Sequence, residues 1–157
     1  MALQKISRPS IFASKPISMT ISMDGGGSGS CALCSQTAAL AQDMLNAVTS
    51  FHRLHLKVTG LGSYAAHKAL NEAYDAFGDH ADDLVEEFQG AEETLLEYPN
   101  TAPTELNSVE EGLEHLRKLK DKINSLQANM PYSEIVNQLD NAKSTINGVK
   151  YKLLFLK

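Results

Sequence analysis

The chain has 157 residues, a formal net charge of −5 and no tryptophan. That length is normally one domain with a core large enough to fold without disulfides or metals, and the negative charge argues against nucleic-acid binding by the domain as a whole. No apolar run approaches the roughly 20 residues of a membrane-spanning helix, and Lys15 and two prolines interrupt the only segment placed like a signal peptide. We therefore expect a protein of the cytoplasm, or of a virion if the chain comes from a phage.

Residues 1–33 differ in composition from the rest and are expected to form an extended tail. They are rich in Ser, Pro and Met and contain GGGSGS, a flexible-linker composition. Lys5, Arg8 and Lys15 are balanced only by Asp24 within the first 30 residues, so DNA contact through them would be weak and salt-sensitive. We expect the tail to bind a neighbouring subunit or a larger protein assembly.

The two cysteines of the chain, Cys31 and Cys34, form a lone CALC at the end of this tail. One such pair supplies half of a four-ligand zinc site, and the sequence has no second pair. The βαβ context of a redox motif is also missing. Two reduced thiols near the start of a helix are the expected state, and a zinc protein is the weakest of the readings.

Residues 34–157 are expected to form a helical domain, and its first half contains two helices. The first helix carries an apolar stripe at three- and four-residue steps, made of Leu40, Met44, Val48, Phe51, His55 and Val58. Gly60 and Gly62 end this helix, and Ser63 can cap the next. The second helix is expected over about residues 64–89, with Gly90 as its stop.

The second half of the domain is expected to contain two more helices. A short helical turn is predicted before Pro99 and Pro103, which prevent its continuation. Ser108 and Glu111 form a capping box for the third helix, and Ser133 opens the fourth. The apolar stripes of these two helices are Val109, Leu113, Leu116, Ile123, Leu126 and Met130, and Ile135, Leu139, Ala142, Ile146, Val149, Leu153 and Leu156.

Four helices of roughly 23–27 residues, each with one apolar face, predict an all-α four-helix bundle. The connection between the second and third helices, about 17 residues long, can cross the whole bundle, whereas up-and-down bundles use shorter connections. We therefore expect a ferritin-like arrangement with one long crossover between helices two and three.

A set of histidines and carboxylates stands out within the first two helices. His55 occupies the apolar stripe of the first helix, where a Leu would be expected. On the second helix, His67, Asn71, Asp82 and Glu86 share one side, because each residue turns the helix by about 100°. Asp82 and Glu86 are one turn apart, and their oxygens suit iron or manganese.

Distance decides what kind of site these residues could make. His67 and Asp82 are fifteen residues apart, which is about 22 Å along a helix, so one metal ion cannot reach both on one chain. Two copies of the second helix, antiparallel about a twofold axis, would bring the histidine end of one onto the carboxylate end of the other. His55 joins His67 because the glycine break folds the helices together. The alternative is two ordinary helices, with His55 in the core and the acids on a solvated face.

The run HLKVTGLGSYAAH followed by DHADDLVEE resembles the signature region of the Dps-like miniferritins of the ferritin-like superfamily. In that family a His followed by a VxG turn ends helix one, a second His comes twelve residues later, and an Asp and a Glu four residues apart follow after fifteen more. His55 and His67 match the histidine positions, and Asp82 and Glu86 match the carboxylate positions. The similarity covers about residues 38–90.

The resemblance implies a hollow homo-dodecamer with iron sites at its twofold interfaces. Members of the family oxidise ferrous iron with peroxide and store the ferric mineral. On this basis His55 and His67 would bind iron, and the partner subunit's Asp82 and Glu86 would balance its charge. We expect an iron-binding miniferritin whose only enzymatic activity is a weak ferroxidase, with no catalytic residues apart from the metal ligands.

Two departures from the family pattern weaken the expectation of oxidation. Asn71 stands where the family usually has a third carboxylate, and Leu56 stands where an aromatic residue usually follows the first His. The chain is also similar to small Dps-like proteins of tailed phages whose role is uncertain. The alternative is therefore a structural or interaction protein, such as a virion or assembly component, that keeps the bundle without ferroxidase activity.

Overall fold

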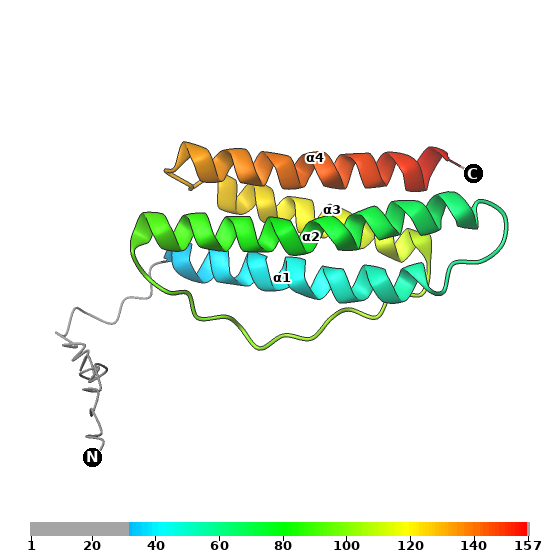
Figure 1. Ribbon diagram of the computed structural model, residues 1–157, viewed down its shortest axis with the longest axis horizontal. Helices are drawn as coiled ribbons and strands as arrows, with labels where there is room; N and C mark the ends of the chain where they lie inside the picture. The colour runs from blue at the N-terminus through cyan, green and yellow to red at the C-terminus, as the bar shows by residue number, and fades with distance from the viewer. Residues whose placement is uncertain (1–31, 157) are drawn as a thin grey trace, which may run out of the picture.

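The computed structural model describes residues 32–156, and this part of the chain is all-helical (Figure 1). Its helices are α1 (Ala32–His55), α2 (Ser63–Glu92), α3 (Val109–Gln127) and α4 (Ser133–Phe155). The predicted four-helix bundle is confirmed. None of the helices in this part of the chain is long and apolar enough to cross a membrane. The expectations about Lys5, Arg8, Lys15 and Cys31 fall on residues outside the described part, whereas Cys34 packs partly buried against the core.

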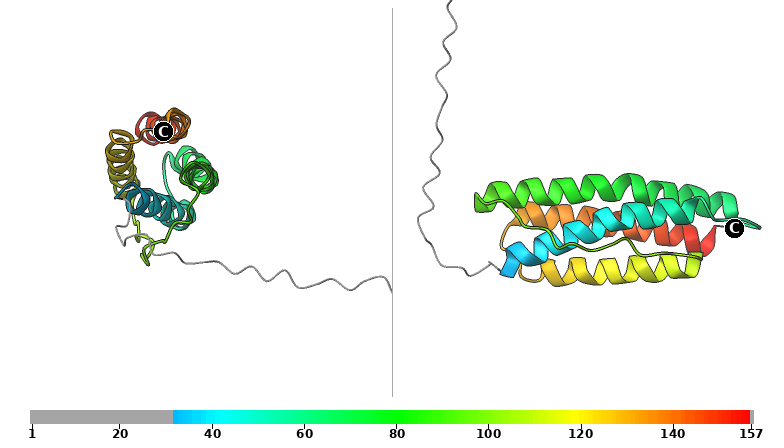
Figure 2. Two further views of the ribbon diagram at one scale, coloured as in Figure 1. Left: turned by 90° about the vertical axis from the view of Figure 1, so that its left-hand side faces the viewer. Right: turned by 90° about the horizontal axis from the view of Figure 1, so that it is seen from below.

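Two short connections and one long one set the order of the helices in the bundle. Residues 56–62 join α1 to α2, and residues 128–132 join α3 to α4, so each of these pairs is antiparallel (Figure 1). Residues 93–108 run back along α1 for the length of the bundle, so that α2 and α3 start at the same end (Figure 2). α1 and α4 each contact α2 and α3, which makes every neighbouring pair antiparallel.

Polar and apolar contacts fix the long connection to the bundle. The Asn46 side-chain amide donates a hydrogen bond to the Thr101 hydroxyl oxygen at 2.9 Å. Glu105 pairs with Arg53 of α1 and with Lys57 of the turn that follows α1. The segment also buries Leu96 and Leu106, which are only 8% and 3% exposed. The short helical turn predicted before Pro99 is wrong, because residues 94–107 have no helix and follow the bundle in an extended path.

The predicted end of α2 at Gly90 is also wrong. The helix continues to Glu92 and ends at Glu93, whose φ of 50° is left-handed and whose N–H bonds to the Gln89 carbonyl. One glycine inside a helix costs only about 1 kcal/mol relative to alanine, and the Tyr132 hydroxyl holds the last turn by donating to the Glu92 carboxylate at 2.7 Å. Gly90 itself lies exposed on the surface.

The predicted starts of α3, after Ser108, and of α4, at Ser133, are confirmed. The predicted cap of α2 at Ser63 is wrong by one residue. Ser108 caps α3 by accepting a hydrogen bond from the Glu111 N–H at 3.2 Å, as the capping box predicts. The cap of α2 is Gly62 rather than Ser63, and no side chain bonds to this helix start. Ser63 is the first residue of the helix, because the left-handed Gly62, with φ 77°, makes the turn into it.

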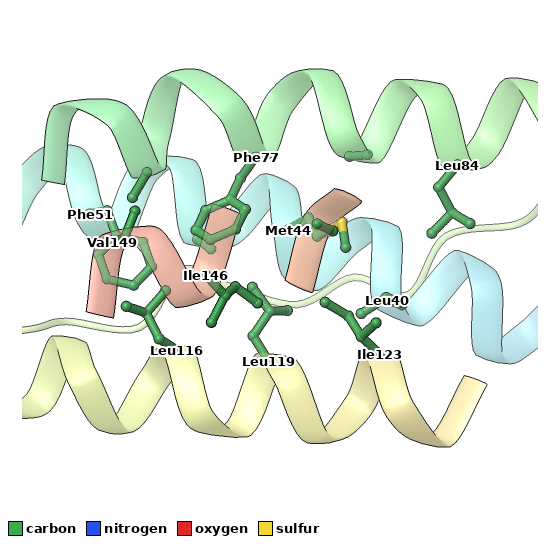
Figure 3. Packing of buried hydrophobic residues seen from close by; sticks show 14 of the residues in the cluster. Leu40, Met44, Phe51, Phe77, Leu84, Leu116, Leu119, Ile123, Ile146 and Val149 are labelled. Atoms are coloured by element: carbon green, nitrogen blue, oxygen red, sulfur yellow. The ribbon is translucent and has the colours of Figure 1, made fainter. Parts of the chain in front are cut away.

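Side chains from all four helices fill the core (Figure 3). Each helix contributes fully buried side chains to the core. They include Met44 and Phe51 of α1, Phe77 and Leu84 of α2, Leu116 and Ile123 of α3, and Ile146 and Val149 of α4. Most residues of the predicted apolar stripes meet here, but Val58 and Met130 lie beyond the ends of α1 and α3, and Leu156 is 44% exposed. This packing holds α1 and α2 side by side and so determines where their histidines lie.

Candidate functional site

The turn between α1 and α2 brings two imidazoles together. α1 ends at His55, and the turn uses left-handed backbone at Gly60, with φ 87°, and at Gly62 to start α2 beside it. The His55 and His67 rings stack with their centroids 3.7 Å apart and an interplanar angle of 27°. His55 is 7% exposed, while His67 lies on the surface. The predicted meeting of these two histidines at the glycine break is what the structure shows.

Each histidine also hydrogen-bonds to the backbone of the other. The His55 Nδ1 lies 3.0 Å from the His67 carbonyl oxygen, and the His67 Nδ1 lies 3.3 Å from the His55 carbonyl oxygen. A carbonyl oxygen can only accept, so each Nδ1 must donate its N–H. A neutral ring in this arrangement keeps the lone pair on Nε2, and neither Nε2 has a hydrogen-bond partner within residues 32–156. Metal-binding histidines typically have this arrangement, with the second ring nitrogen donating to a carbonyl or carboxylate.

Tyr74 joins the histidine pair to the polar face of α2. Its ring stacks on His52 at a centroid distance of 4.4 Å and meets the His55 ring edge-on at 5.2 Å. Its hydroxyl donates to the Asn71 side-chain oxygen at 2.9 Å, and the Asn71 amide donates to Asp75. His52 is exposed. Tyr74 was not among the residues predicted from the sequence, although it lies two turns after His67 on the same side of α2.

The two carboxylates of the predicted site lie elsewhere on the same chain. Asp82 and Glu86 are exposed on α2, about 22 Å along the helix from His67 at 1.5 Å per residue. Within residues 32–156, no three His, Cys, Asp or Glu side chains gather closely enough to hold a metal ion. On one chain, the two histidines and the two acids of the predicted metal site are therefore too far apart to bind the same ion.

The surface of α2 between the two halves of this site is acidic and has a shallow, open depression. A pocket of about 530 Å³ lies there, lined by Lys68, Asn71, Glu72, Asp75, Ala76 and Asp79. Beyond it, burial and then the charge of Asp82 raise the pKa of the Tyr98 hydroxyl, so this group stays protonated beside the carboxylate. The side chains of another helix could pack on this surface. Its lining contains three acidic residues and one lysine, so it carries a net negative charge.

Comparison with known families identifies the helical domain. A family of unknown function, DUF5856, matches residues 55–153, which is more than half of the chain. The chain belongs to the DUF5856 family. No curated protein and no solved structure matches it. The matched region of this DUF5856 protein begins at His55 and includes His67, Asn71, Asp82 and Glu86.

Two other histidines of the DUF5856 domain hold helices together. The His80 Nε2 lies 2.8 Å from the Thr145 hydroxyl oxygen and so links α2 to α4. His115 of α3 packs edge-on against Phe51 of α1, with centroids 5.5 Å apart. Burial lowers the pKa of both histidines, and it outweighs the opposite effect of Asp83 and Asp79 on His80. His80 and His115 thus have structural roles in this DUF5856 protein.

The lowered pKa of His80 predicts a loss of stability in mild acid. The unfolded chain takes up a proton near the ordinary pKa of 6.5, whereas the folded chain takes it up only at a lower pH. The free energy of unfolding should therefore fall as the pH drops below about 6.5, and stop falling once the lowered pKa has been passed. Urea denaturation between pH 7.5 and 5 measures this slope. His80→Gln should reduce the slope and leave the part due to His115; an unchanged slope would contradict the assignment.

Proposed function

We propose that this DUF5856 protein is a Dps-like miniferritin: a homo-oligomeric, ferritin-like bundle that binds ferrous iron at sites completed between subunits. The observation that carries the proposal is the reciprocal hydrogen bonding of His55 and His67, which leaves an unused Nε2 lone pair on each neutral ring. A buried histidine without a metal also donates to a carbonyl, so the feature that favours metal binding is that both Nε2 atoms stay unpaired. Two such imidazoles side by side form half of a site for iron.

The topology is consistent with this class of protein. One crossover along the bundle, with antiparallel neighbours throughout, is the arrangement of ferritin-like bundles. The candidate ligands lie on α1 and α2, and those on α2 are exposed at the surface, where another subunit can reach them. The dodecameric shell remains an expectation from the family resemblance.

The separation of the two halves supports sites shared between subunits. Each subunit would bind iron through the imidazoles of His55 and His67, while Asp82 and Glu86 of the partner subunit would balance its charge. Bound ferrous iron would be the substrate of a slow oxidation by peroxide. The activity is expected to be weak because the Asn71 amide adds no negative charge and is held by Tyr74 and Asp75.

Ferrous iron binding and its oxidation by peroxide test the proposal. The protein is titrated anaerobically with ferrous iron, and peroxide is then added while ferric-oxo absorbance is followed. His67→Ala, a change at an exposed position, and His55→Ala should both reduce binding and absorbance to background. His52→Phe is the matched control, because it removes an exposed imidazole from the same surface, keeps an aromatic ring stacked on Tyr74, and should leave both signals unchanged. Equal traces for the protein and His67→Ala would overturn the proposal.

One observation favours the second candidate, a structural or interaction protein such as a virion component. The amide of Asn71 is engaged on both sides, by the Tyr74 hydroxyl and by Asp75, which is how a purely structural polar network would look. On this reading the protein would assemble through its tail and bind no iron. The mass of the assembly in solution and its iron content after loading distinguish the two candidates. Binding of DNA through Lys5, Arg8 and Lys15 is expected to be weak or absent under either.

A further inference from the structure

The outer face of α4 is uncharged along the length of the helix. α4 lies at one edge of the bundle, where its inner face packs against α2 and α3 (Figures 1 and 2). We name the residues of the opposite face the outer seam: Asn137, Asn141, Ser144, Gly148, Tyr151 and Phe155. The exposed side of α3, by contrast, carries acids together with Arg117 and Lys118. An uncharged face on a helix of this protein therefore needs an explanation.

The spacing of the outer seam is that of a helix-packing surface. Its residues follow one another at alternating steps of four and three, the pattern along which two helices pack in a coiled coil. The buried face of α4 has the same spacing, in Ile135, Leu139, Ala142, Ile146, Val149 and Leu153. Tyr151 and Phe155 of the outer seam are 56% and 68% exposed, and their ring centroids lie 5.6 Å apart. Exposed aromatic rings gathered in this way mark an interaction site.

Packing within the subunit does not explain the glycine in the middle of the outer seam. Gly148 lies inside α4, and a Cβ built on it would meet no atom of a neighbouring segment within 4 Å. Alanine would fit there and would favour the helix. A glycine on a helix surface allows another backbone to approach closely, and Ser144, one turn earlier, is also small. The middle of the outer seam therefore suits the close approach of a second helix.

The outer seam is complementary to itself when two copies are antiparallel. About a twofold axis at the middle of the helix, Tyr151 faces the partner's Asn141. The Asn141 amide donates to Gln138 at 3.2 Å within the subunit, so its side-chain oxygen can accept from the partner's Tyr151 hydroxyl. Ser144 faces the partner's Gly148 in the same arrangement. Parallel copies would instead place tyrosine on tyrosine and glycine on glycine, which packs less evenly.

The charges beside the outer seam favour the same orientation. The first half of α4 carries the acids Glu134 and Asp140 with one cation, Lys143. The second half carries Lys150 and Lys152 and no acid. Antiparallel copies place the more acidic half of one helix beside the basic half of the other, whereas parallel copies place like charges together. A second copy of α4 therefore fits this face in both shape and charge.

We infer that the outer seam is a twofold interface between two copies of this chain, with their α4 helices antiparallel. Such a contact is isologous, because the same residues contribute from both sides. The candidate iron ligands lie on α1 and α2, so this interface is separate from the candidate iron site. The inference holds whether or not His55 and His67 bind iron.

Paired cysteines test the contact in the full-length protein. Asn141→Cys and Tyr151→Cys are made in separate chains that both carry Cys31→Ser and Cys34→Ser. Co-expressed and mildly oxidised, the two chains should form a disulfide-linked heterodimer, because facing positions lie within reach of a disulfide. Asn141→Cys alone should not link to its own copy, which lies about 15 Å away along the helix axis. Asn141→Cys with Ser125→Cys, at an exposed position of α3, is the matched control and should give no heterodimer.

An arginine in the middle of the outer seam distinguishes this contact from random collisions. Gly148→Arg in both chains should lower the yield of the heterodimer at least about tenfold, because each arginine would be buried against the partner's Ser144 without a balancing charge. Ser125→Arg in both chains is the control and should leave the yield unchanged. A yield no higher than that of the control pair of cysteines would overturn the inference. A disulfide formed by Asn141→Cys alone would overturn the antiparallel arrangement.

Discussion

Two variants that bind no iron on their own are expected to regain binding when they are assembled together. His67→Ala removes an imidazole from every site, and Asp82→Asn with Glu86→Gln removes both carboxylates. If each site combines the histidines of one subunit with the acids of another, a site is intact only when one subunit keeps its histidines and its neighbour keeps its acids. At equal amounts each condition is met in about half of the cases, so about one quarter of the sites are intact after random mixing. Anaerobic titration with ferrous iron measures the recovered number of sites.

This result depends on the distance along α2 and not on the family resemblance. About 22 Å separates His67 from Asp82 on one helix, and the described residues contain no group of three metal-binding side chains on one chain. The matched control is Asp83→Asn, a change at an exposed neighbour of Asp82, used in place of the acidic double variant. This variant should bind iron on its own, and mixing it with His67→Ala should not change the total number of sites. Subunits with different mass tags show that co-assembly has occurred. Mixed assemblies that still bind no iron would exclude a site shared between subunits.

The histidine pair could be predicted from the sequence because its causes are local. Gly60 and Gly62 supply the left-handed turn, and helical spacing places His55 and His67 on facing sides of the hairpin. The hydrogen bonds from each ring to the opposite carbonyl could not be predicted. They depend on ring orientations that the packing of Tyr74 against both His52 and His55 determines. No pattern of residue types encodes such a contact.

The errors in the sequence-based prediction come from tertiary contacts that outweigh local preference. Gly90 is a poor helix residue, yet α2 continues past it because the Tyr132 hydroxyl holds Glu92. The segment before Pro99 has helix-forming residues, but it is extended because Leu96 is buried against the bundle and Glu105 is paired with α1. The acids of the candidate site are a different case. Their partners would belong to another chain, and neither the sequence nor a single subunit can place them.

An acid at position 71, where the Dps-like family usually has a carboxylate, should lower the stability of the fold and raise the affinity for metal. Asn71→Asp replaces the amide that donates to Asp75 with a second carboxylate one turn away. Loss of that hydrogen bond and the new repulsion should lower the free energy of unfolding by about 1 kcal/mol without metal. With ferrous iron, the added negative charge should raise affinity by about tenfold, since hard oxygen donors favour this ion. Thermal unfolding with and without iron, and anaerobic titration, measure the two effects.

Asn71→Ala separates the charge from the loss of the hydrogen bonds. Alanine removes both contacts, whereas aspartate loses the donation to Asp75 but keeps an oxygen that can accept from the Tyr74 hydroxyl. Asn71→Ala should therefore also lower stability, without raising affinity for iron. A miniferritin site predicts that iron restores the stability of Asn71→Asp but not that of Asn71→Ala. If the two variants respond alike to iron, position 71 lies outside any metal site, and the network of Asn71, Tyr74 and Asp75 serves only to hold the surface of α2. The opposite signs expected with and without iron follow from one cause: a second carboxylate beside Asp75 is unfavourable until a cation balances it.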